Sequence, residues 1–262
     1  MSEKKNILTI DNLLIQFGGL KAISDVSIHV DEGDFVGIIG PNGAGKTTLY
    51  NAITGNVPLT SGSISFMGKN LAKLRPDQIN NLGISRTFQN IRLFPKMSAL
   101  WNVSASLSSV PRYNILEAFL RTPKVKRIDR EVEEKAHYYL ELMDLKGYEN
   151  QQAGNMPYGL QRRLEIARAL ACEPKLLLLD EPAAGMNNDE CNELADVLRK
   201  IKKELNITIV LIEHHMDFVM QLCERLYVLN LGEILAEGTP EEVQNDPKVI
   251  KAYLGERREI DG

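Results

Sequence analysis

The sequence predicts an α/β fold: a mainly parallel core sheet flanked by helices, with an N-terminal antiparallel β subdomain and an inserted helical subdomain. Three observations predict it. Short β segments separated by turn residues fill the first third of the chain. A polar, helical stretch follows over residues 97–146. Beyond it, short apolar runs alternate with helical patterns, which is typical of a parallel sheet covered on both faces.

In the first third, five short segments rich in β-branched and aromatic residues predict strands. They lie at residues 7–10, 13–17, 26–30, 35–39 and 63–66. Between the last two, we expect a helix over residues 45–53, because Leu49, Ala52 and Ile53 have helical spacing. Gly55 ends it.

The inserted stretch carries the i,i+4 pairs Arg127/Glu131 and Glu131/Lys135, which support a solvated helix. The elements after it are expected as helix 157–171, strand 176–179, helix 189–204, strand 207–212, helix 216–222 and strand 226–229. We therefore divide the chain into a core, residues 1–88 and 172–262, and a helical unit, residues 89–171, that ends in the helix starting at 157.

Composition excludes several classes of protein. The 262 residues are 44% hydrophobic, and 31 Lys and Arg against 35 Asp and Glu give a net charge of −4. This balance excludes a generically basic nucleic-acid binder, so no nucleic-acid partner is expected. Cys172, Cys191 and Cys223 form no CxxC pair, which favours a reduced compartment. No signal peptide is evident and no apolar run approaches about 18 residues, so we expect a chain that is soluble by itself and cytoplasmic.

A phosphate-binding motif follows the apolar run at residues 35–39. It reads Gly40-Pro41-Asn42-Gly43-Ala44-Gly45-Lys46-Thr47 and matches G-x-x-x-x-G-K-[ST], with a strand before it and a helix after it. Glycines let successive N–H groups face a phosphate, and the helix N-terminus adds partial positive charge. We expect Lys46 to bridge the β- and γ-phosphates of a bound nucleotide and Thr47 to bind Mg²⁺. Thr48, the next residue, is included in the expected nucleotide site. The alternative is a glycine-rich turn that happens to precede Lys-Thr.

Two acidic residues end the apolar run at 176–179. Parallel strands bind ligands at their carboxyl ends, so Asp180 is expected to hold Mg²⁺ through water. Glu181 then faces the γ-phosphate as the general base for the attacking water. The alternative is a simple strand-to-loop turn.

With these motifs in order, the chain resembles the ATP-binding cassette family, the nucleotide-binding subunits of ABC transporters, over nearly its whole length. The resemblance implies a P-loop NTPase of ABC type whose ATPase activity is coupled to transmembrane transport. It implies that Gln89 contacts metal and water and relays the nucleotide state to a membrane partner. It also implies that His214 contacts the γ-phosphate and that Phe17 stacks on adenine. The alternatives are that Gln89 is a surface residue, that Phe17 is a core residue, and that the pair His214-His215 is a metal site.

The family's signature, Leu-Ser-Gly-Gly-Gln, corresponds here to Met156-Pro157-Tyr158-Gly159-Leu160. By resemblance, Pro157, Tyr158, Gly159 and Leu160 contact the ATP bound to a partner cassette. Pro157 supplies neither hydroxyl nor N–H, although proline suits a first helical turn. A hydrogen bond to a charged phosphate is worth about 1.5–3 kcal/mol, so its loss weakens the contact about 10- to 100-fold unless Gly159 compensates. Asn187 also departs, because the family commonly has Asp there. We therefore predict a heterodimer with one degenerate site.

Several segments resemble the branch that serves branched-chain amino acid uptake, specifically its cassette with the longer helical subdomain. They are residues 86–94, 158–159, 180–187, 212–214 and 250–255. This resemblance implies a second, different cassette, two integral-membrane permease subunits and an external substrate-binding protein. It places the chain at the cytoplasmic face of the membrane as a peripheral protein. By resemblance, Phe94, Pro95 and Trp101 form the groove for the permease; alternatively, Phe94 and Trp101 are core residues.

Alternative functions remain open at this point. Urea-uptake cassettes and the lipopolysaccharide-export ATPase share the same style of sequence. A soluble cassette acting on DNA or ribosomes is disfavoured by the single cassette, the absence of heptads and the net charge of −4. A GTP-dependent switch is disfavoured because no N-K-x-D motif is present. The transported solute depends on resemblance alone.

Overall fold

The computed structural model describes residues 5–107, 117 and 119–260. Its N-terminal part is an antiparallel sheet of four strands in the order β2-β1-β4-β5. The strands are β1 (Asn6–Phe17), β2 (Leu20–Asp31), β4 (Ser61–Phe66) and β5 (Lys69–Asn70). The segments predicted at 7–10 and 13–17 are one strand, whose register shifts between Ile10 and Leu13 around Asn12 at φ 43°. This is the antiparallel β subdomain that the sequence predicts.

The core sheet has six strands in the order β10-β9-β3-β8-β7-β6. They are β3 (Phe35–Ile39), β6 (Ile84–Arg86), β7 (Leu176–Asp180), β8 (Thr208–Ile212), β9 (Arg225–Asn230) and β10 (Glu233–Gly238). Neighbouring strands are parallel except β9 and β10. Every residue of β3, β7 and β8 is buried, as expected of parallel strands with both faces covered. The predicted parallel sheet is confirmed.

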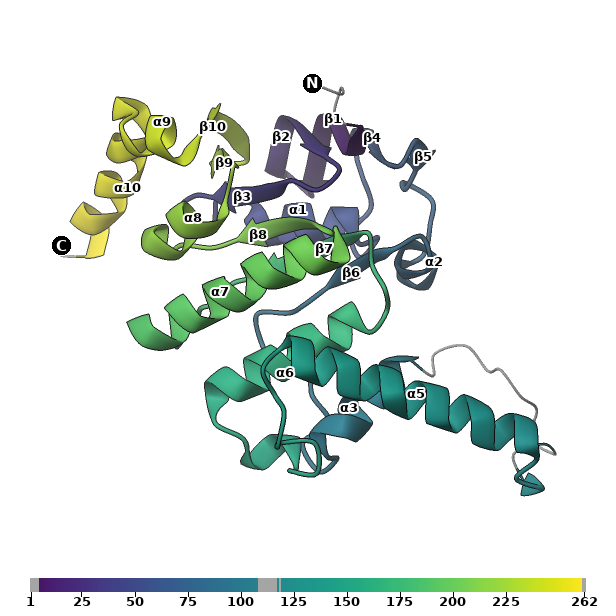
Figure 1. Cartoon of the computed structure of the whole chain (residues 1–262). Coiled ribbons are helices and arrows are strands. Elements are labelled where there is room, and N and C mark those ends of the chain that lie inside the picture. The colour runs from purple at the N-terminus through teal and green to yellow at the C-terminus, as the bar shows by residue number, and fades with distance from the viewer. Residues whose placement is uncertain (1–4, 108–116, 118, 261–262) are drawn as a thin grey trace.

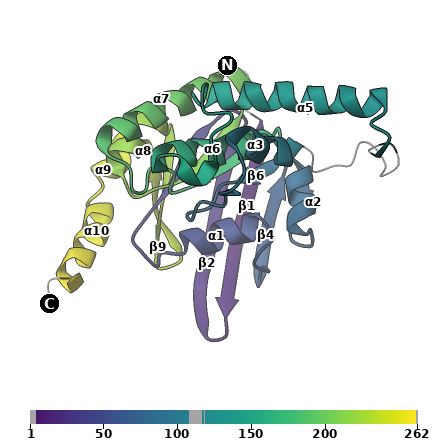
Figure 2. The same cartoon turned by 90° about the horizontal axis from the view of Figure 1, so that it is seen from below.

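Helices cover the two faces of this sheet. Helix α1 (Lys46–Ile53) lies between the core sheet and the antiparallel sheet, and one hydrophobic cluster joins all three (Figure 2). On the other face lie α7 (Asn188–Leu205) and α8 (Met216–Leu222). Helix α7 buries Leu194, Leu198 and Ile201 at helical spacing. The short α2 (Pro76–Asn81) precedes β6, and α9 (Pro240–Gln244) and α10 (Pro247–Ile260) follow β10.

The helical unit lies at one end of the molecule (Figure 1). It contains α3 (Ala99–Leu107), α5 (Pro123–Leu142), the short η1 (Ala153–Asn155) and α6 (Tyr158–Leu170). Helix α5 packs against α3 and projects away from the core sheet (Figure 1). The predicted pair Arg127–Glu131 forms at 3.7 Å, but Lys135 pairs with Glu173 rather than Glu131.

Helix α6 joins the helical unit to the core. Leu164, Ala167 and Ala171 are buried in the cluster that also holds α7 and β7, and Leu160 packs against it. The face predicted from helical spacing is therefore confirmed. Within residues 5–107, 117 and 119–260, no helix combines the length and the apolar character needed to cross a membrane.

Candidate nucleotide-binding site

The loop between β3 and α1 has the backbone that a phosphate cradle needs. Gly40 has φ 150°, and a Cβ there would lie 2.0 Å from the carbonyl oxygen of Leu229. Gly45 has φ 105°, and a Cβ there would lie 2.7 Å from the carbonyl oxygen of Ala22. These two positions therefore exclude any side chain. Gly45 precedes α1 without any side-chain cap, so among the described residues no side chain occupies the helix N-terminus.

Lys46 is the first residue of α1, directly after this loop. Its ammonium donates hydrogen bonds to the carbonyl oxygens of Gly40 at 2.6 Å and Pro41 at 2.8 Å. The side chain is thus folded back over the loop. A phosphate seated on the loop would meet both the ammonium and the helix N-terminus.

Asp180 is the last residue of β7, as predicted, and its side chain is buried. Its Oδ2 accepts a hydrogen bond of 2.7 Å from Arg86, and the two side chains are only 5% and 7% exposed. Arg86 also donates to Asn51 Oδ1 at 2.7 Å. The Arg86 pairing was not foreseen, because its partner is ninety-four positions away in the sequence.

Tyr50 of α1 lies beside this ion pair. The Arg86 guanidinium is 5.4 Å from the centre of the Tyr50 ring. The Tyr50 hydroxyl donates to the carbonyl oxygen of Val210 at 2.7 Å. Burial raises the pKa of Tyr50 well above its ordinary value, and the Asp180 carboxylate raises it further. Tyr50 therefore stays neutral and ties α1 to β8.

Three predicted catalytic residues come together next to Asp180. The Gln89 amide donates to Glu181 Oε2 at 2.9 Å, and His214 Nδ1 lies 4.0 Å from Glu181 Oε1. Glu181 has φ 47°, a left-handed conformation that glutamate seldom takes, and its N–H donates to the carbonyl oxygen of Ile212. The predicted glutamine, general base and histidine therefore form one group.

Glu213 organises this group and was missed by the sequence reasoning. It is fully buried, and its Oε1 accepts the Ala183 N–H at 2.9 Å. Its Oε2 accepts the N–H groups of His214 at 2.8 Å and His215 at 3.1 Å. The sequence carries no signal for this role, because the burial of the carboxylate and its backbone partners exist only in the folded chain.

A hollow of about 610 Å³ joins the phosphate loop to Gln89 and Glu181, while Asp180 and His214 are not among its lining residues. Its lining contains Phe17, Leu20, Lys21, Ala22, Asn42, Gly43, Ala44, Gly45, Lys46, Thr47, Thr48, Gln89, Glu181 and Leu231. The sequence predicts ten of these residues as site residues, and they come from four separate segments. Leu20, Lys21, Ala22 and Leu231 were not foreseen, because a hairpin turn and the β9–β10 turn bring them there.

The four signature residues lie elsewhere and none lines this hollow. Pro157, at φ −51° and ψ 149°, is the residue before α6, so the expectation of a first helical turn is wrong by one position. Tyr158 is half exposed and its hydroxyl accepts from Arg162 at 3.1 Å. Asn187 caps α7: its side chain accepts the Glu190 N–H at 3.0 Å. This capping role is a structural reason for asparagine at that position.

Arg162 connects α6 to the Gln89 segment, residues 86–94. It is fully buried and donates to the carbonyl oxygens of Phe88 at 2.7 Å and Gln89 at 2.8 Å. Glu165 pairs with Arg162 at 2.8 Å, and its other oxygen faces the N–H groups of Phe88 and Arg92. Burial raises the pKa of Glu165, while Arg162 opposes that shift. The start of α6 and the Gln89 segment are therefore held together.

The predicted permease-facing residues are at the surface. Trp101 is 65% exposed and Phe94 is 48% exposed, so the alternative that they are core residues is wrong. The Phe94 N–H donates to Asn102 Oδ1 at 2.8 Å, and the Arg168 guanidinium lies 5.1 Å from the Phe94 ring centre. Pro95 is also exposed, and its carbonyl oxygen accepts from Gly154.

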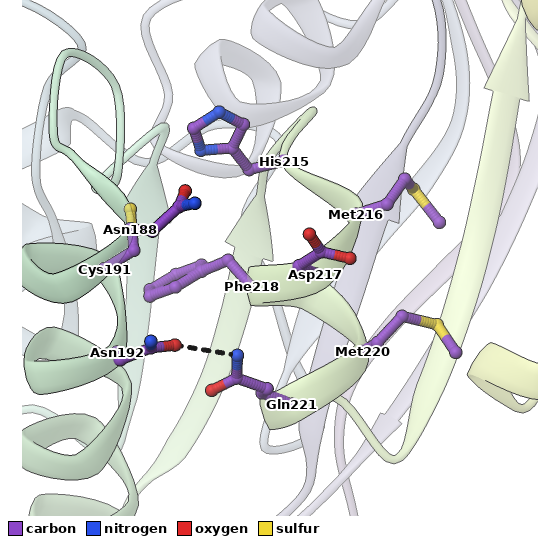
Figure 3. A pocket seen from close by; sticks show the side chains of 9 residues that line it. All are labelled: Asn188, Cys191, Asn192, His215, Met216, Asp217, Phe218, Met220 and Gln221. Carbon is purple, nitrogen blue, oxygen red and sulfur yellow. Dashed lines mark hydrogen bonds between the residues drawn. The ribbon is translucent and has the colours of Figure 1, made fainter.

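The second histidine of the pair lines a different hollow, of about 590 Å³, between α7 and α8 (Figure 3). His215 lies there with Asn188 and Cys191, and Gln221 donates to Asn192 at 3.0 Å across its floor. The His214 and His215 ring centres are 5.4 Å apart. Because His214 lies beside Glu181 and His215 lines this other hollow, the pair is not arranged as a shared metal site.

Family models match two parts of the chain. One described as ABC transporter matches residues 23–184, and one described as branched-chain amino acid ATP-binding cassette transporter matches residues 233–259.

Curated relatives match nearly the whole chain. It is 43% identical to the high-affinity branched-chain amino acid transport ATP-binding protein LivG of Salmonella typhimurium, over 95% of this chain and 98% of the relative. It is 44% identical to BraF of Pseudomonas aeruginosa, a protein with the same description, over the same shares. A probable LivG of Methanocaldococcus jannaschii is 35% identical over 98% of this chain and all of the relative.

Solved structures give the same picture. The ADP conformation of an ATP-binding cassette of an ABC transporter has a TM-score of 0.83 and 34% identity, covering 95% of this chain and 99% of the other. A nucleotide-free cassette has a TM-score of 0.81 and 33% identity, covering 95% and 98%. A dimeric bacterial ABC transporter cassette has a TM-score of 0.75 and 26% identity, covering 89% and 99%.

Proposed function

The chain belongs to the ATP-binding cassette family of ABC transporters, and from this premise we propose that it hydrolyses ATP to power an importer of branched-chain amino acids. The observation that carries the proposal is the hydrogen bond between Gln89 and Glu181 at the mouth of the phosphate loop. It joins Gln89, which is expected to relay the nucleotide state to the membrane partner, to Glu181, which is expected to activate water. The relatives named for branched-chain amino acid transport, and the family match at residues 233–259, support this solute over urea or lipopolysaccharide.

The chemistry follows from the positions of the side chains. The loop amides and Lys46 bind the β- and γ-phosphates and offset the negative charge that builds up during transfer. Thr47, Gln89 and Asp180 supply oxygen atoms, the ligand type that Mg²⁺ takes, with Asp180 acting through water because Arg86 holds its carboxylate. When bound, Mg²⁺ neutralises phosphate charge. Glu181 accepts the proton of the attacking water, and His214, whose Nδ1 lies 4.0 Å from Glu181 Oε1, is proposed to contact the γ-phosphate.

The second nucleotide contact comes from another cassette. Pro157, Tyr158, Gly159 and Leu160 lie outside the hollow and are proposed to face the ATP of a partner. Because Pro157 has no hydroxyl or N–H, we propose that the partner is a different chain and that the site completed here turns over slowly. A solved bacterial ABC transporter cassette that is 26% identical to this chain is dimeric, which supports the proposed pairing of two cassettes.

The remaining partners are integral-membrane permeases and, indirectly, an external substrate-binding protein. The exposed residues Phe94, Pro95 and Trp101 are proposed as the permease contact, with the protein peripheral at the cytoplasmic face of the membrane. Arg162 and Glu165 hold the Gln89 segment to α6, so movement at this contact reaches both Gln89 and the signature residues. Residues 89–171 are the proposed helical unit, which starts with the Gln89 segment and ends in the signature helix α6.

A pull-down tests this proposal. Tagged Glu181→Gln protein is purified from detergent extracts of its source cells with ATP and Mg²⁺, and co-purifying chains are identified by mass spectrometry. Two polytopic permeases and a second, different cassette are the expected result. Recovery of the chain with itself alone, or with ribosomal or DNA-associated proteins, would falsify the assignment to an importer.

A further inference from the structure

Leu231 is an exposed leucine in a costly backbone conformation. It is 83% exposed and has φ 48°, the left-handed region that favours glycine and asparagine. It is at the β9–β10 turn, far in sequence from the phosphate loop, yet it lines the same hollow as Lys46 and Glu181. This leucine gains little from burial within the chain, and asparagine would suit its backbone better.

The turn that carries Leu231 is fixed to the phosphate loop. The N–H of Gly232 donates to the carbonyl oxygen of Ala44 at 3.0 Å, and the Gly232 carbonyl accepts from Ser24 at 2.8 Å. A Cβ at Gly232 would lie 2.8 Å from the carbonyl oxygen of Ala22, so the turn packs directly against β2. The Leu231 backbone is therefore held in place at the mouth of the hollow.

Two more apolar side chains stand at the same mouth. Phe17 and Leu20 are register partners on either side of the Gly18-Gly19 turn, and they are 50% and 69% exposed. Two turns from different sheets thus present three large apolar side chains to one hollow whose floor is the phosphate loop. Isolated exposed leucines are ordinary, but three apolar groups around one opening mark a binding surface.

We propose that Leu231, together with Leu20, contacts the base of the bound nucleotide and completes the base site that begins with Phe17. This rests on the proposed function, because it assumes ATP in the hollow. The phosphates are then held by the loop and Lys46, while the base is enclosed by the two turns. These apolar side chains contact the face of a base and form no hydrogen bonds with its edge. They therefore do not distinguish adenine from guanine, and GTP should bind nearly as well as ATP.

Leu231→Asn tests the inference, because asparagine accepts the left-handed backbone and removes the apolar side chain. Binding of ATP and of inorganic tripolyphosphate, which has no base, is measured by isothermal titration calorimetry on the purified full chain. We expect ATP to bind about five- to tenfold more weakly, on the scale of partial burial of a leucine, while tripolyphosphate binds as in the wild type. Leu231→Met should restore most of the affinity for ATP. Ile250→Asn, a matched change of an exposed apolar residue on α10, should alter neither ligand.

Two results would overturn the inference. Unchanged ATP affinity in Leu231→Asn shows that the side chain does not touch the base. An equal loss for ATP and tripolyphosphate shows that the turn acts only by holding the phosphate loop. In both cases the wild-type chain still binds ATP, so the proposed function stands. Absence of ATP binding by the wild-type chain removes both proposals together.

Discussion

The side-chain amide of Gln89 donates a hydrogen bond of 2.9 Å to Oε2 of Glu181, although ninety-two positions separate the two residues. Gln89 follows β6 and Glu181 follows β7, and these strands are parallel neighbours, so both residues leave the sheet at the same edge. Arg162 of α6 donates a hydrogen bond to the carbonyl oxygen of Gln89. We therefore expect the position of α6 to affect whether Gln89 reaches Glu181, the proposed general base.

Glu181→Gln should lower ATP turnover about 10²- to 10⁴-fold, because the amide cannot take a proton from water. ATP binding should persist, since the phosphate loop and Lys46 are unchanged. The variant should therefore accumulate as a closed cassette dimer with ATP. Phosphate release and size-exclusion chromatography with ATP and Mg²⁺ measure the two effects.

The control for that change is Glu204→Gln, which removes an exposed carboxylate on α7. It should leave turnover unaltered. Wild-type turnover in Glu181→Gln would mean that another group acts as the base.

Lys46→Ala should weaken ATP binding about 10- to 100-fold, the value of one or two hydrogen bonds to a charged phosphate. Calorimetric titration with ATP measures it. Lys69→Ala, on the exposed strand β5, is the matched loss of one positive charge and should change nothing. Equal losses in the two variants would indicate a general electrostatic effect instead of a direct contact.

Arg86→Gln should destabilise the protein by about 3–5 kcal/mol, because it leaves the buried Asp180 carboxylate without its cation. The free energy of unfolding in urea measures this effect. Arg75→Gln breaks an ion pair of similar length, 2.8 Å to Asp77, but on the open surface. That control should unfold at the wild-type urea concentration. A mild effect at Arg86 would mean that the Asp180 carboxylate does not depend on this cation for its stability.

Phe94→Ala should leave basal ATP hydrolysis intact and reduce the hydrolysis that the permease and loaded binding protein stimulate, because Phe94 lies at the surface and does not line the nucleotide hollow. Turnover with and without the reconstituted permease gives the ratio. Tyr138→Ala, a similarly exposed aromatic on α5, serves as the comparison. Proportional loss of basal and stimulated rates would count against a coupling role.

Pro157→Ser should strengthen nucleotide binding at the composite site that this chain completes, by up to about 10- to 100-fold, because a hydroxyl and an N–H become available. Site-specific hydrolysis in the purified assembly, with the other general base disabled, reports the change. Equal hydrolysis at both sites of the unmodified assembly would contradict the proposed asymmetry.

Local pattern was enough for much of this fold. Strand β3 and helix α8 have the predicted bounds, and α1 is one residue shorter, because apolar periodicity and glycines mark their ends. Strand β10 was missed because it is a half-exposed edge strand with Glu233 and Glu237 in it. Helix α9 was missed although Thr239, Pro240 and Glu242 form a capping box that the sequence displays.

The site residues also fall into two groups, those that the sequence predicts and those that only the folded chain reveals. The phosphate loop and the pair Asp180-Glu181 are contiguous in sequence, so spacing alone predicts them. Arg86, Arg162 and Glu213 act through buried contacts whose partners depend on the folded chain, and no local pattern distinguishes them from surface charges. Leu231 is the extreme case, because only the packing of its turn against β2 brings it to the hollow.

Glu181 has a left-handed backbone conformation that lowers the stability of the folded chain, and the same residue is the proposed general base. Glycine or asparagine would relax that φ of 47°, so conformational preference alone would replace the glutamate. The carboxylate is kept at a residue whose geometry disfavours it, which is the pattern of a trade-off between heat resistance and rate. In evolutionary terms, loss of the proposed catalytic role would favour replacement of this glutamate by glycine or asparagine.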